Sequence, residues 1–330
     1  MTTTTTEART LSYSKAVAEA IALEMQRDPA VLLVGEDIGP HGGVFQATAG
    51  LHASFGGERV LDTPISEAGF LGMAVGAAIA GKRPIVELMF MDFALVAADQ
   101  LWNQAAKLRY LSGDRLRVPL TIRTQHGVGR GTAAQHSQSF EALFAHIPGF
   151  AVALPSNPAD AKGLLTTAIR SDDPVVVIEH KMLYGTKGEV PEGEHLVPFG
   201  QAAVRRPGTD VTLISYSRSM QVVTEAAEQL AAEGVEAEVI DLRTIMPLDV
   251  DTMLKSIAKT RRAVVVHEAH RAYGPGAEIA ARITEAAWDE LAAPVARVGG
   301  LDIPVPYASS LEEAWLPSPD DVVAATRPLL

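Results

Sequence analysis

The chain has 330 residues, a formal net charge of −12 and no Cys. Its length is enough for two ordinary domains, and the acidic balance without a long basic run argues against nucleic acid or an anionic membrane as a partner. The lack of Cys excludes disulfides and thiolate metal sites, and it fits a reducing compartment.

The N-terminus, Met1-Thr-Thr-Thr-Thr-Thr-Glu, carries no apolar stretch of the kind found in a secretory signal. We expect residues 1–10 to form a disordered tail. The most apolar run of the chain stops at Lys82 and Arg83 and is too short to span a bilayer. The sequence therefore predicts neither a signal peptide nor a transmembrane segment.

Strand and helix patterns alternate through the first half of the chain. Short apolar runs predict buried strands, and apolar residues at helical spacing predict helices. The predicted strands cover residues 31–34, 59–62, 84–90, 118–123, 150–154 and 174–178. The first predicted helix begins after a cap at Ser12 or Ser14 and stops at Asp28-Pro29, and two further helices cover 92–113 and 158–170. Residues 39–57 are rich in Gly and predict a long surface loop. Continuous apolar strands between helices indicate a parallel α/β sheet.

A further helix is predicted to start between Ile65 and Ala68, after a turn at Pro64 and a cap at Ser66. The residues that follow are apolar on every side and rich in Gly and Ala, so this helix should be buried and should let another backbone approach closely. Its one ionisable residue is Glu67. The pattern alone leaves two interpretations open: a first-turn carboxylate that faces the helix dipole, or a carboxylate that carries chemistry.

Periodicity fails between Tyr184 and Phe199, where Gly and Pro accumulate among charges, and a second strand–helix pattern follows. The sequence predicts an α/β fold of two domains, each a mainly parallel sheet flanked by helices. We place the first domain at residues 11–185, the linker at 186–200 and the second domain at 201–330.

A glycine-rich segment with Gly127, Gly129 and Gly131 follows the predicted strand 118–123. Its spacing does not match a dinucleotide-binding or P-loop fingerprint. It is either a flexible loop or a nest of backbone N–H groups that cradles a phosphate. Neither a nucleophile elbow nor a pair of His residues with zinc-hydrolase spacing occurs in the sequence.

Four stretches nevertheless resemble a known family. They are Asp62-Thr-Pro-Ile-Ser-Glu-Ala-Gly-Phe, Pro84-Ile-Val-Glu-Leu-Met-Phe, Asp99-Gln-Leu-Trp-Asn-Gln-Ala-Ala-Lys and Ala133-Ala-Gln-His-Ser-Gln. Together with Val239-Ile-Asp-Leu-Arg-Thr-Ile-Met-Pro-Leu-Asp, they resemble the beta subunits of thiamine-dependent 2-oxo acid dehydrogenases, from about Leu11 to Leu330. The resemblance implies a transketolase-like pyrimidine-binding domain followed by a transketolase C-terminal-like domain.

The resemblance also implies roles for individual residues. Glu67 matches the glutamate that hydrogen-bonds the pyrimidine nitrogen of thiamine diphosphate, and Met89 and Phe93 match residues that pack on the pyrimidine. His136 matches a histidine that handles protons near the reacting centre. A potassium ion is implied at the positions of Leu120, Ala168, Ile169, Ser171 and Asp173. An ordinary helix-cap carboxylate, a core aromatic and a hydrogen-bonded loop histidine are the competing interpretations of Glu67, Phe93 and His136.

Partners and substrate follow from the same resemblance. The family holds magnesium through a Gly-Asp-Gly motif, which this chain lacks, so magnesium and half of the thiamine site are expected on an alpha subunit in an alpha-2 beta-2 tetramer. The activity implied is oxidative decarboxylation of pyruvate, or cleavage of acetoin, with acyl transfer to the lipoyl group of an acyltransferase in a bacterial-type cytoplasmic complex. The alternatives are a branched-chain 2-oxo acid dehydrogenase beta subunit, the C-terminal half of a split transketolase, and a non-catalytic docking subunit.

Overall fold

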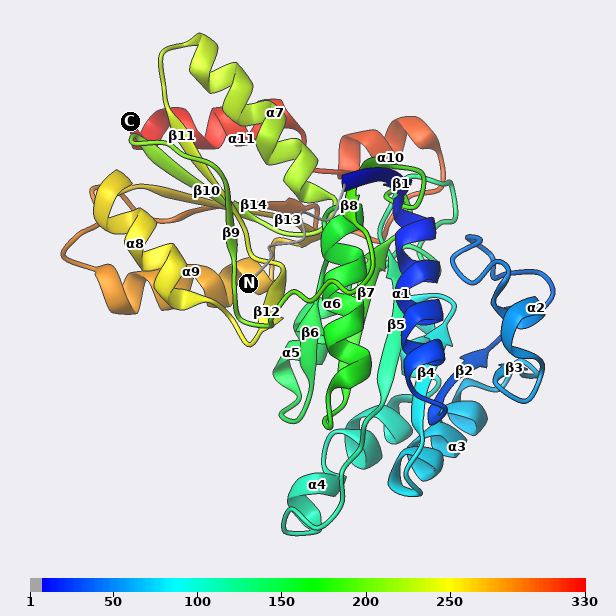
Figure 1. Ribbon diagram of the computed structural model, residues 1–330. Coiled ribbons are helices and arrows are strands. Elements are labelled where there is room, and N and C mark those ends of the chain that lie inside the picture. The colour runs from blue at the N-terminus through cyan, green and yellow to red at the C-terminus, as the bar shows by residue number, and fades with distance from the viewer. Residues whose placement is uncertain (1–7) are drawn as a thin grey trace, which may run out of the picture. The chain divides into compact units, whose positions relative to one another are not determined.

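The computed structural model describes residues 8–330, which form two compact units (Figure 1). Unit 1 consists of the described residues up to His126 together with Phe144–Phe199, and unit 2 consists of Gly127–Leu143 and Gly200–Leu330. The segment Gly127–Leu143 thus groups with unit 2, although strands of unit 1 precede and follow it along the chain. No helix within residues 8–330 combines the length and apolar character needed to cross a membrane.

The sheet of unit 1 is parallel and has the order β6-β7-β5-β4-β2-β3. These strands are β2 (Val31–Gly35), β3 (Val60–Asp62), β4 (Arg83–Leu88), β5 (Thr121–His126), β6 (Ala151–Ala153) and β7 (Val175–His180). Their continuous apolar runs are buried, as a sheet covered on both faces requires. The predicted parallel α/β architecture is confirmed.

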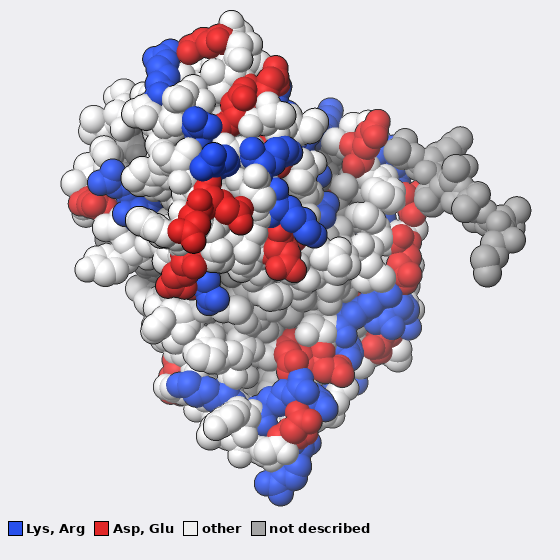
Figure 2. All heavy atoms as spheres, turned by 90° about the vertical axis from the view of Figure 1, so that its left-hand side faces the viewer, with Lys and Arg blue, Asp and Glu red and all other residues white. Residues whose placement is uncertain are grey.

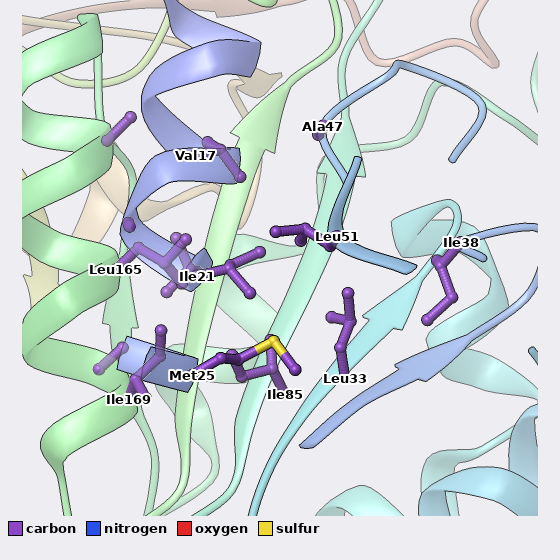
Figure 3. Packing of buried hydrophobic residues seen from close by; sticks show 14 of the residues in the cluster. Val17, Ile21, Met25, Leu33, Ile38, Ala47, Leu51, Ile85, Leu165 and Ile169 are labelled. Atoms are coloured by element: carbon purple, nitrogen blue, oxygen red, sulfur yellow. The ribbon is translucent and has the colours of Figure 1, made fainter. Parts of the chain in front are cut away.

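Two helices of unit 1 pack against each other beside this sheet: α1 (Tyr13–Arg27) and α6 (Pro158–Arg170). Each begins at a side-chain cap, where Ser12 accepts from the backbone N–H of Lys15 and Asn157 accepts from that of Asp160. Figure 3 shows the core that their apolar faces bury against the strands and the loop after β2. It includes Val17, Ile21, Met25, Leu33, Ile38, Ala47, Leu51, Ile85, Leu165 and Ile169.

The central helix, α3 (Glu67–Ile79), contacts β2 and β4, and its start agrees with the prediction. Ser66 is its N-cap residue, but the Ser66 side chain makes no capping hydrogen bond. The Ser66 hydroxyl oxygen instead lies where a Cβ on Gly69 would come within 2.6 Å of it, so this position favours Gly.

Two sequence predictions for unit 1 are wrong. The single helix predicted over residues 92–113 is broken into η1 (Met91–Leu95), η2 (Asp99–Ala105) and α4 (Leu108–Leu111), and η2 is a π-helix. The loop predicted over residues 39–57 contains α2 (Leu51–Phe55).

The predicted tail and linker are also partly ordered. Residues 8–10 of the tail belong to β1 (Ala8–Ser12), which pairs antiparallel with β8 (Lys187–Pro191) inside the predicted linker. Residues 1–7 of the predicted tail lie outside the described residues. Pairing between segments so far apart in the chain leaves no local signal in either of them.

Unit 2 has a five-stranded sheet in the order β14-β13-β10-β11-β9, in which only β9 is antiparallel to its neighbour. Helices α7 and α11 contact each other and the sheet, and so do α8 and α9. The strands are β9 (Ala203–Arg206), β10 (Val211–Ser215), β11 (Ala237–Asp241), β13 (Ala263–His270) and β14 (Ala296–Gly300), with a short β12 (Thr244–Met246). The helices are α7 (Ser219–Ala232), α8 (Val250–Thr260), α9 (Pro275–Ala287), α10 (Ser309–Trp315), α11 (Pro319–Thr326) and η3 (Arg327–Leu329), and α5 (Glu141–His146) precedes them in the chain.

Charged side chains of both signs are interspersed on the face that Figure 2 shows. Red and blue groups lie next to one another there, with broad uncharged areas between them. This mixed pattern agrees with an acidic chain that pairs many of its cations with carboxylates of its own.

Candidate functional site

Glu67 is the first residue of α3 and is buried, with 7% of its surface exposed. Strand β3 ends at Asp62, and a turn through Pro64 leads from it into the helix. No other residue of α3 is ionisable. The sequence thus places one buried carboxyl group at the positive end of the dipole of an apolar helix.

A second carboxylate, Glu36, follows β2 and lies within electrostatic reach of Glu67. Strands β2 and β3 are parallel neighbours, with Gly35 opposite Asp62, so the segments that leave their carboxyl ends start side by side. Glu36 is as buried as Glu67, again with 7% exposed. Among the described residues, its Oε1 finds no hydrogen-bond partner.

Burial raises the pKa of Glu36, and the nearby charges of Glu67 and Asp37 raise it further. A hydrogen bond from the Ser66 backbone acts in the opposite direction. Glu36 therefore keeps its proton to higher pH than an ordinary glutamate does, and it can be neutral while a neighbouring carboxylate is charged. A carboxyl group that keeps its proton within electrostatic reach of a second carboxyl group is an arrangement that can hold and exchange a proton. Sequence analysis missed Glu36; the available signal was its place directly after a buried strand.

Aromatic side chains line the chain after the neighbouring strand, β4. Phe93, in η1, is half-buried, and its ring lies edge-on to that of Phe90, with 5.8 Å between the ring centroids. Phe90 in turn meets Phe45 edge-on at 6.0 Å. Met89, half-buried, follows β4 directly. The two predicted packing residues, Met89 and Phe93, thus belong to an apolar, aromatic segment next to the strand that leads to Glu36.

A buried ionic group crosses three neighbouring strands of the same sheet. Arg123 on β5 donates to Glu87 on β4 at 2.7 Å, and through two nitrogens to Glu179 on β7 at 2.8 and 2.7 Å. The Tyr184 hydroxyl also donates to Glu179, at 2.5 Å. One guanidinium faces two carboxyl groups, and burial together with Glu179 raises the pKa of Glu87. Sequence analysis did not identify this group, because strand register brings its members together.

His136 lies in the segment Gly127–Leu143, within unit 2, and is half-buried. Thr132 donates its hydroxyl to the His136 carbonyl at 3.2 Å, and the same hydroxyl lies 2.9 Å from that of Ser137. The His136 N–H donates to the Ala133 carbonyl at 3.4 Å. The histidine therefore sits on a tight turn whose backbone is held by neighbouring side chains.

The residues predicted for potassium lie at the end of α6, in the turn to β7 and before β5. Arg83 donates to the carbonyls of Ile169 and Ser171 at 3.1 and 2.8 Å. The other predicted carbonyls accept hydrogen bonds within the chain: Ala168 from the Ser171 N–H, Leu120 from the Val175 N–H, and Asp173 from the Ser171 hydroxyl. A guanidinium thus already supplies positive charge to this turn. Potassium at this turn stays a prediction.

A site for a divalent metal does not arise from the described part of the chain. Within residues 8–330, no group of three or more His, Asp or Glu side chains could hold a metal ion.

Two family models match the chain. Residues 9–187 match the pyrimidine-binding domain of transketolase, and residues 200–322 match the transketolase C-terminal domain. The beta subunit of acetoin:2,6-dichlorophenolindophenol oxidoreductase from Cupriavidus necator is 47% identical over 330 residues, covering 97% of each chain. The chain belongs to the family of transketolase-like dehydrogenase beta subunits.

Other members show how broad this family is. The pyruvate dehydrogenase E1 beta subunit of Porphyra purpurea is 47% identical over 304 residues, covering 92% of each chain. The 2-oxoisovalerate dehydrogenase beta subunit of Bacillus subtilis is 44% identical and covers 97% of this chain and 98% of its own. A solved split-gene transketolase, described as an inactive beta4 tetramer, superposes with a TM-score of 0.80 at 25% identity, covering 97% of this chain and 98% of its own. The family resemblance and the two-domain transketolase-like fold are confirmed.

Among the other buried acids of this dehydrogenase beta subunit, Glu141 lies at the start of α5. Its Oε1 accepts from the Tyr216 hydroxyl at 3.0 Å. Burial raises the pKa of Glu141 from 4.5 to about 7, and the charge of Glu268 contributes in the same direction. Glu141 therefore titrates near neutral pH in the folded chain.

We expect this group to make stability pH-dependent. Between pH 4.5 and about 7 the folded chain keeps a proton on Glu141 that the unfolded chain has released, so the free energy of unfolding falls as pH rises through this window. The loss is on the order of 3 kcal/mol, because each unit of pKa difference corresponds to about 1.4 kcal/mol. Denaturant unfolding at pH 5 and pH 8 should show that Glu141→Gln removes this pH dependence and is the more stable protein at pH 8.

The matched control is Glu285→Gln, since Glu285 is exposed on α9 of the same unit. That variant should keep the wild-type pH dependence. An unchanged slope in Glu141→Gln would show that Glu141 does not carry the titration.

Proposed function

We propose that the chain is the beta subunit of the decarboxylating component of a thiamine diphosphate-dependent 2-oxo acid dehydrogenase, acting on pyruvate or cleaving acetoin. The observation that carries this proposal is the buried pair of Glu67 and Glu36, set at the start of an apolar helix in the region that matches a pyrimidine-binding domain. The similarity to acetoin and pyruvate dehydrogenase beta subunits over nearly the whole chain supports the same assignment.

The carboxyl pair fits a pyrimidine. An aminopyrimidine presents a ring nitrogen that accepts a proton, and a buried carboxyl group can share one with it. In this proposal Glu67 bonds that nitrogen, while Glu36, whose pKa is raised, keeps a proton next to it. Met89 and Phe93 supply apolar surface for the ring face. When bound, thiamine diphosphate supplies the electron sink for cleavage next to a carbonyl carbon.

His136 is proposed as the group that moves protons to and from the substrate. An imidazole titrates near neutral pH, so it can donate and accept within one turnover. The backbone of His136 is hydrogen-bonded to Thr132 and Ala133, and these bonds restrict the position of its ring. Acyl transfer to a lipoyl group of an acyltransferase is part of the same proposal.

An alpha subunit is proposed to complete the site. The family resemblance places the ligands of magnesium and the diphosphate on a Gly-Asp-Gly motif that this chain lacks, so in this proposal the alpha subunit supplies them. The alpha subunit can bind on the outward face of α3. Met73 and Ile79 are exposed on this helix, and a Cβ on Gly76 would meet nothing within 4 Å. An apolar, shallow helix face directly after Glu67 suits a helix of the partner, and we propose an alpha-2 beta-2 tetramer.

The substrate is proposed from resemblance alone. The stretches 88–93 and 179–184 resemble acetoin and pyruvate enzymes more than branched-chain ones. Three other functions remain outcomes of the tests: a branched-chain 2-oxo acid dehydrogenase, a split transketolase half and a docking subunit. Dye-coupled assays with pyruvate, acetoin and 2-oxoisovalerate, together with an assay of ketose transfer between sugars, separate them.

We expect thiamine diphosphate with magnesium to bind only when the chain is mixed with its alpha subunit. Calorimetric titration into this chain alone should give no measurable heat, because the chain offers the pyrimidine side but no diphosphate anchor. Titration into the mixture should show saturable binding. Tight binding to the chain alone would contradict the shared site, and binding without any decarboxylation would favour the docking subunit.

A further inference from the structure

The glycine-rich segment before His136 has an unusual backbone. Gly127, Gly129 and Gly131 have φ values of +97°, +114° and +60°, and Ala133 has +56°. Left-handed residues that alternate in this way can turn successive backbone N–H groups to one side, which is how anion-binding nests form. The sequence left a phosphate cradle and a flexible loop as the two interpretations of this segment.

The chain fills this nest with its own carboxylates. Glu268 on β13 accepts from the Val128 N–H at 2.5 Å. Glu312 on α10 accepts from the Gly131 N–H at 3.0 and 3.2 Å, and from the Gly129 N–H at a longer 3.4 Å. Both carboxylates are buried, with 4% and 3% exposed. A phosphate could enter only by displacing two buried, hydrogen-bonded carboxylates, so the segment is neither free nor open.

The helix that carries Glu312 is itself fixed to the same segment. Trp315, one turn further along α10, packs in an apolar cluster with Val128 and Val305. Its indole N–H donates to the Ile303 carbonyl at 3.0 Å. Glu312 and Val128 are thus held by the same small core, and the distance from the carboxylate to the glycine backbone is set by packing.

The glycine-rich segment leads directly to His136. Thr132, the residue after Gly131, is the one whose hydroxyl bonds the His136 carbonyl. A change at Gly131 therefore moves Thr132, and through it the turn that presents the histidine. At the far end of the segment, Glu141 is held by the Tyr216 hydroxyl. Within unit 2, Glu268 thus binds the beginning of the segment and Glu312 binds its middle, while the Tyr216 hydroxyl binds the carboxyl group at its end.

We propose that Glu312, assisted by Glu268, is a positioning residue for His136: its carboxylate holds the glycine nest and so sets the place of the histidine. The consequence for turnover rests on the proposed function, but the contact itself does not. A charged acceptor, here facing the two backbone N–H groups of Gly129 and Gly131, forms stronger hydrogen bonds than a neutral one. Glu312→Gln keeps the size of the side chain and removes that charge.

Hydrogen exchange tests the contact in the chain alone, without cofactor or partner. In Glu312→Gln, the amides of residues 127–139 should exchange about tenfold faster than in the wild type, because a charge-assisted hydrogen bond is replaced by a weaker one. The strands β10 and β13 should keep wild-type protection. Glu312→Asp, which keeps the charge on a shorter side chain, should lie between the two. Glu313→Gln is the matched control, since Glu313 is the next residue of α10 and is exposed.

Kinetics of the enzyme assembled with its alpha subunit test the consequence. We expect kcat of Glu312→Gln to fall about tenfold, since small displacements of a catalytic group cost at least that much, while the KM for thiamine diphosphate stays within about twofold. Wild-type exchange in residues 127–139 of Glu312→Gln would overturn the proposal, and so would a loss of protection spread evenly over unit 2. If the assembled wild type has no dehydrogenase activity, the proposed function fails while the exchange result still decides the role of Glu312.

Discussion

Replacing Glu67 with Gln is expected to lower kcat of the assembled enzyme by about 10²- to 10⁴-fold, the range for loss of a group that exchanges a proton during reaction. Gln fills the same volume and can still form a hydrogen bond, but it cannot give or take a proton. Since Glu67 is buried and no other residue of α3 is ionisable, no other side chain of that helix can replace it. Steady-state kinetics with pyruvate and acetoin measure the effect.

Two other variants show whether the loss is specific. Glu58→Gln changes an exposed carboxylate of the same unit and should leave kcat unchanged. Glu36→Gln should lower kcat less than Glu67→Gln does. The raised pKa of Glu36 favours its neutral form, and Gln resembles that neutral form. Gel filtration must show that Glu67→Gln still assembles with the alpha subunit. Near-normal turnover in that assembled variant would mean that Glu67 is only a helix-cap residue.

The start of α3 could be predicted from the sequence because its signals are local. A turn, a polar cap position and a long apolar run follow one another within a few residues. The catalytic interpretation of Glu67, however, rests on family resemblance and stays a prediction, since the pattern alone left a cap carboxylate open. The electrostatic interaction of Glu36 with Glu67 could not be predicted from the sequence, because it depends on β2 and β3 being neighbours in the sheet.

The errors have a similar origin. The apolar spacing of residues 92–113 fits a helix, yet the chain there breaks into a 3₁₀ turn, a π-helix and one α-helical turn. The ends of the first unit were expected to be irregular, but β1 and β8 pair across more than a hundred residues. The choice between a phosphate cradle and a flexible loop for the glycine-rich segment depends on its contacts with Glu268 and Glu312, which lie far along the chain. In each case the deciding partner is distant in sequence.

The buried ionic group of unit 1 leads to the second large expected effect. Arg123→Met should lower the free energy of unfolding by about 3–5 kcal/mol, because removing one partner leaves buried charge without compensation. Met fills much of the space but leaves Glu87 and Glu179 facing each other in a site that is almost fully buried. Denaturant unfolding of the wild type and the variant measures the loss.

The direction in which the stability of Arg123→Met changes with pH shows whether uncompensated carboxyl charge causes the loss. Without the guanidinium, both carboxyl groups should have raised pKa values in the folded variant, so folding binds protons and stability should fall as pH rises above the ordinary range of glutamate. The penalty of Arg123→Met should therefore be larger at pH 8 than at pH 5. Adding Glu87→Gln and Glu179→Gln should recover part of the stability and remove this pH dependence.

A matched control shows whether the loss of stability depends on burial of the ion pair. Arg282 pairs with Glu278 on the surface of α9, and Arg282→Met should leave the unfolding midpoint unchanged within error, because solvent screens exposed pairs. If Arg123→Met were no more damaging than Arg282→Met, the two carboxyl groups would have to be neutral already in the wild type. Glu87, whose pKa is raised even beside Arg123, would then be the first to hold a proton, and the group would be a hydrogen-bonded network rather than an ionic one.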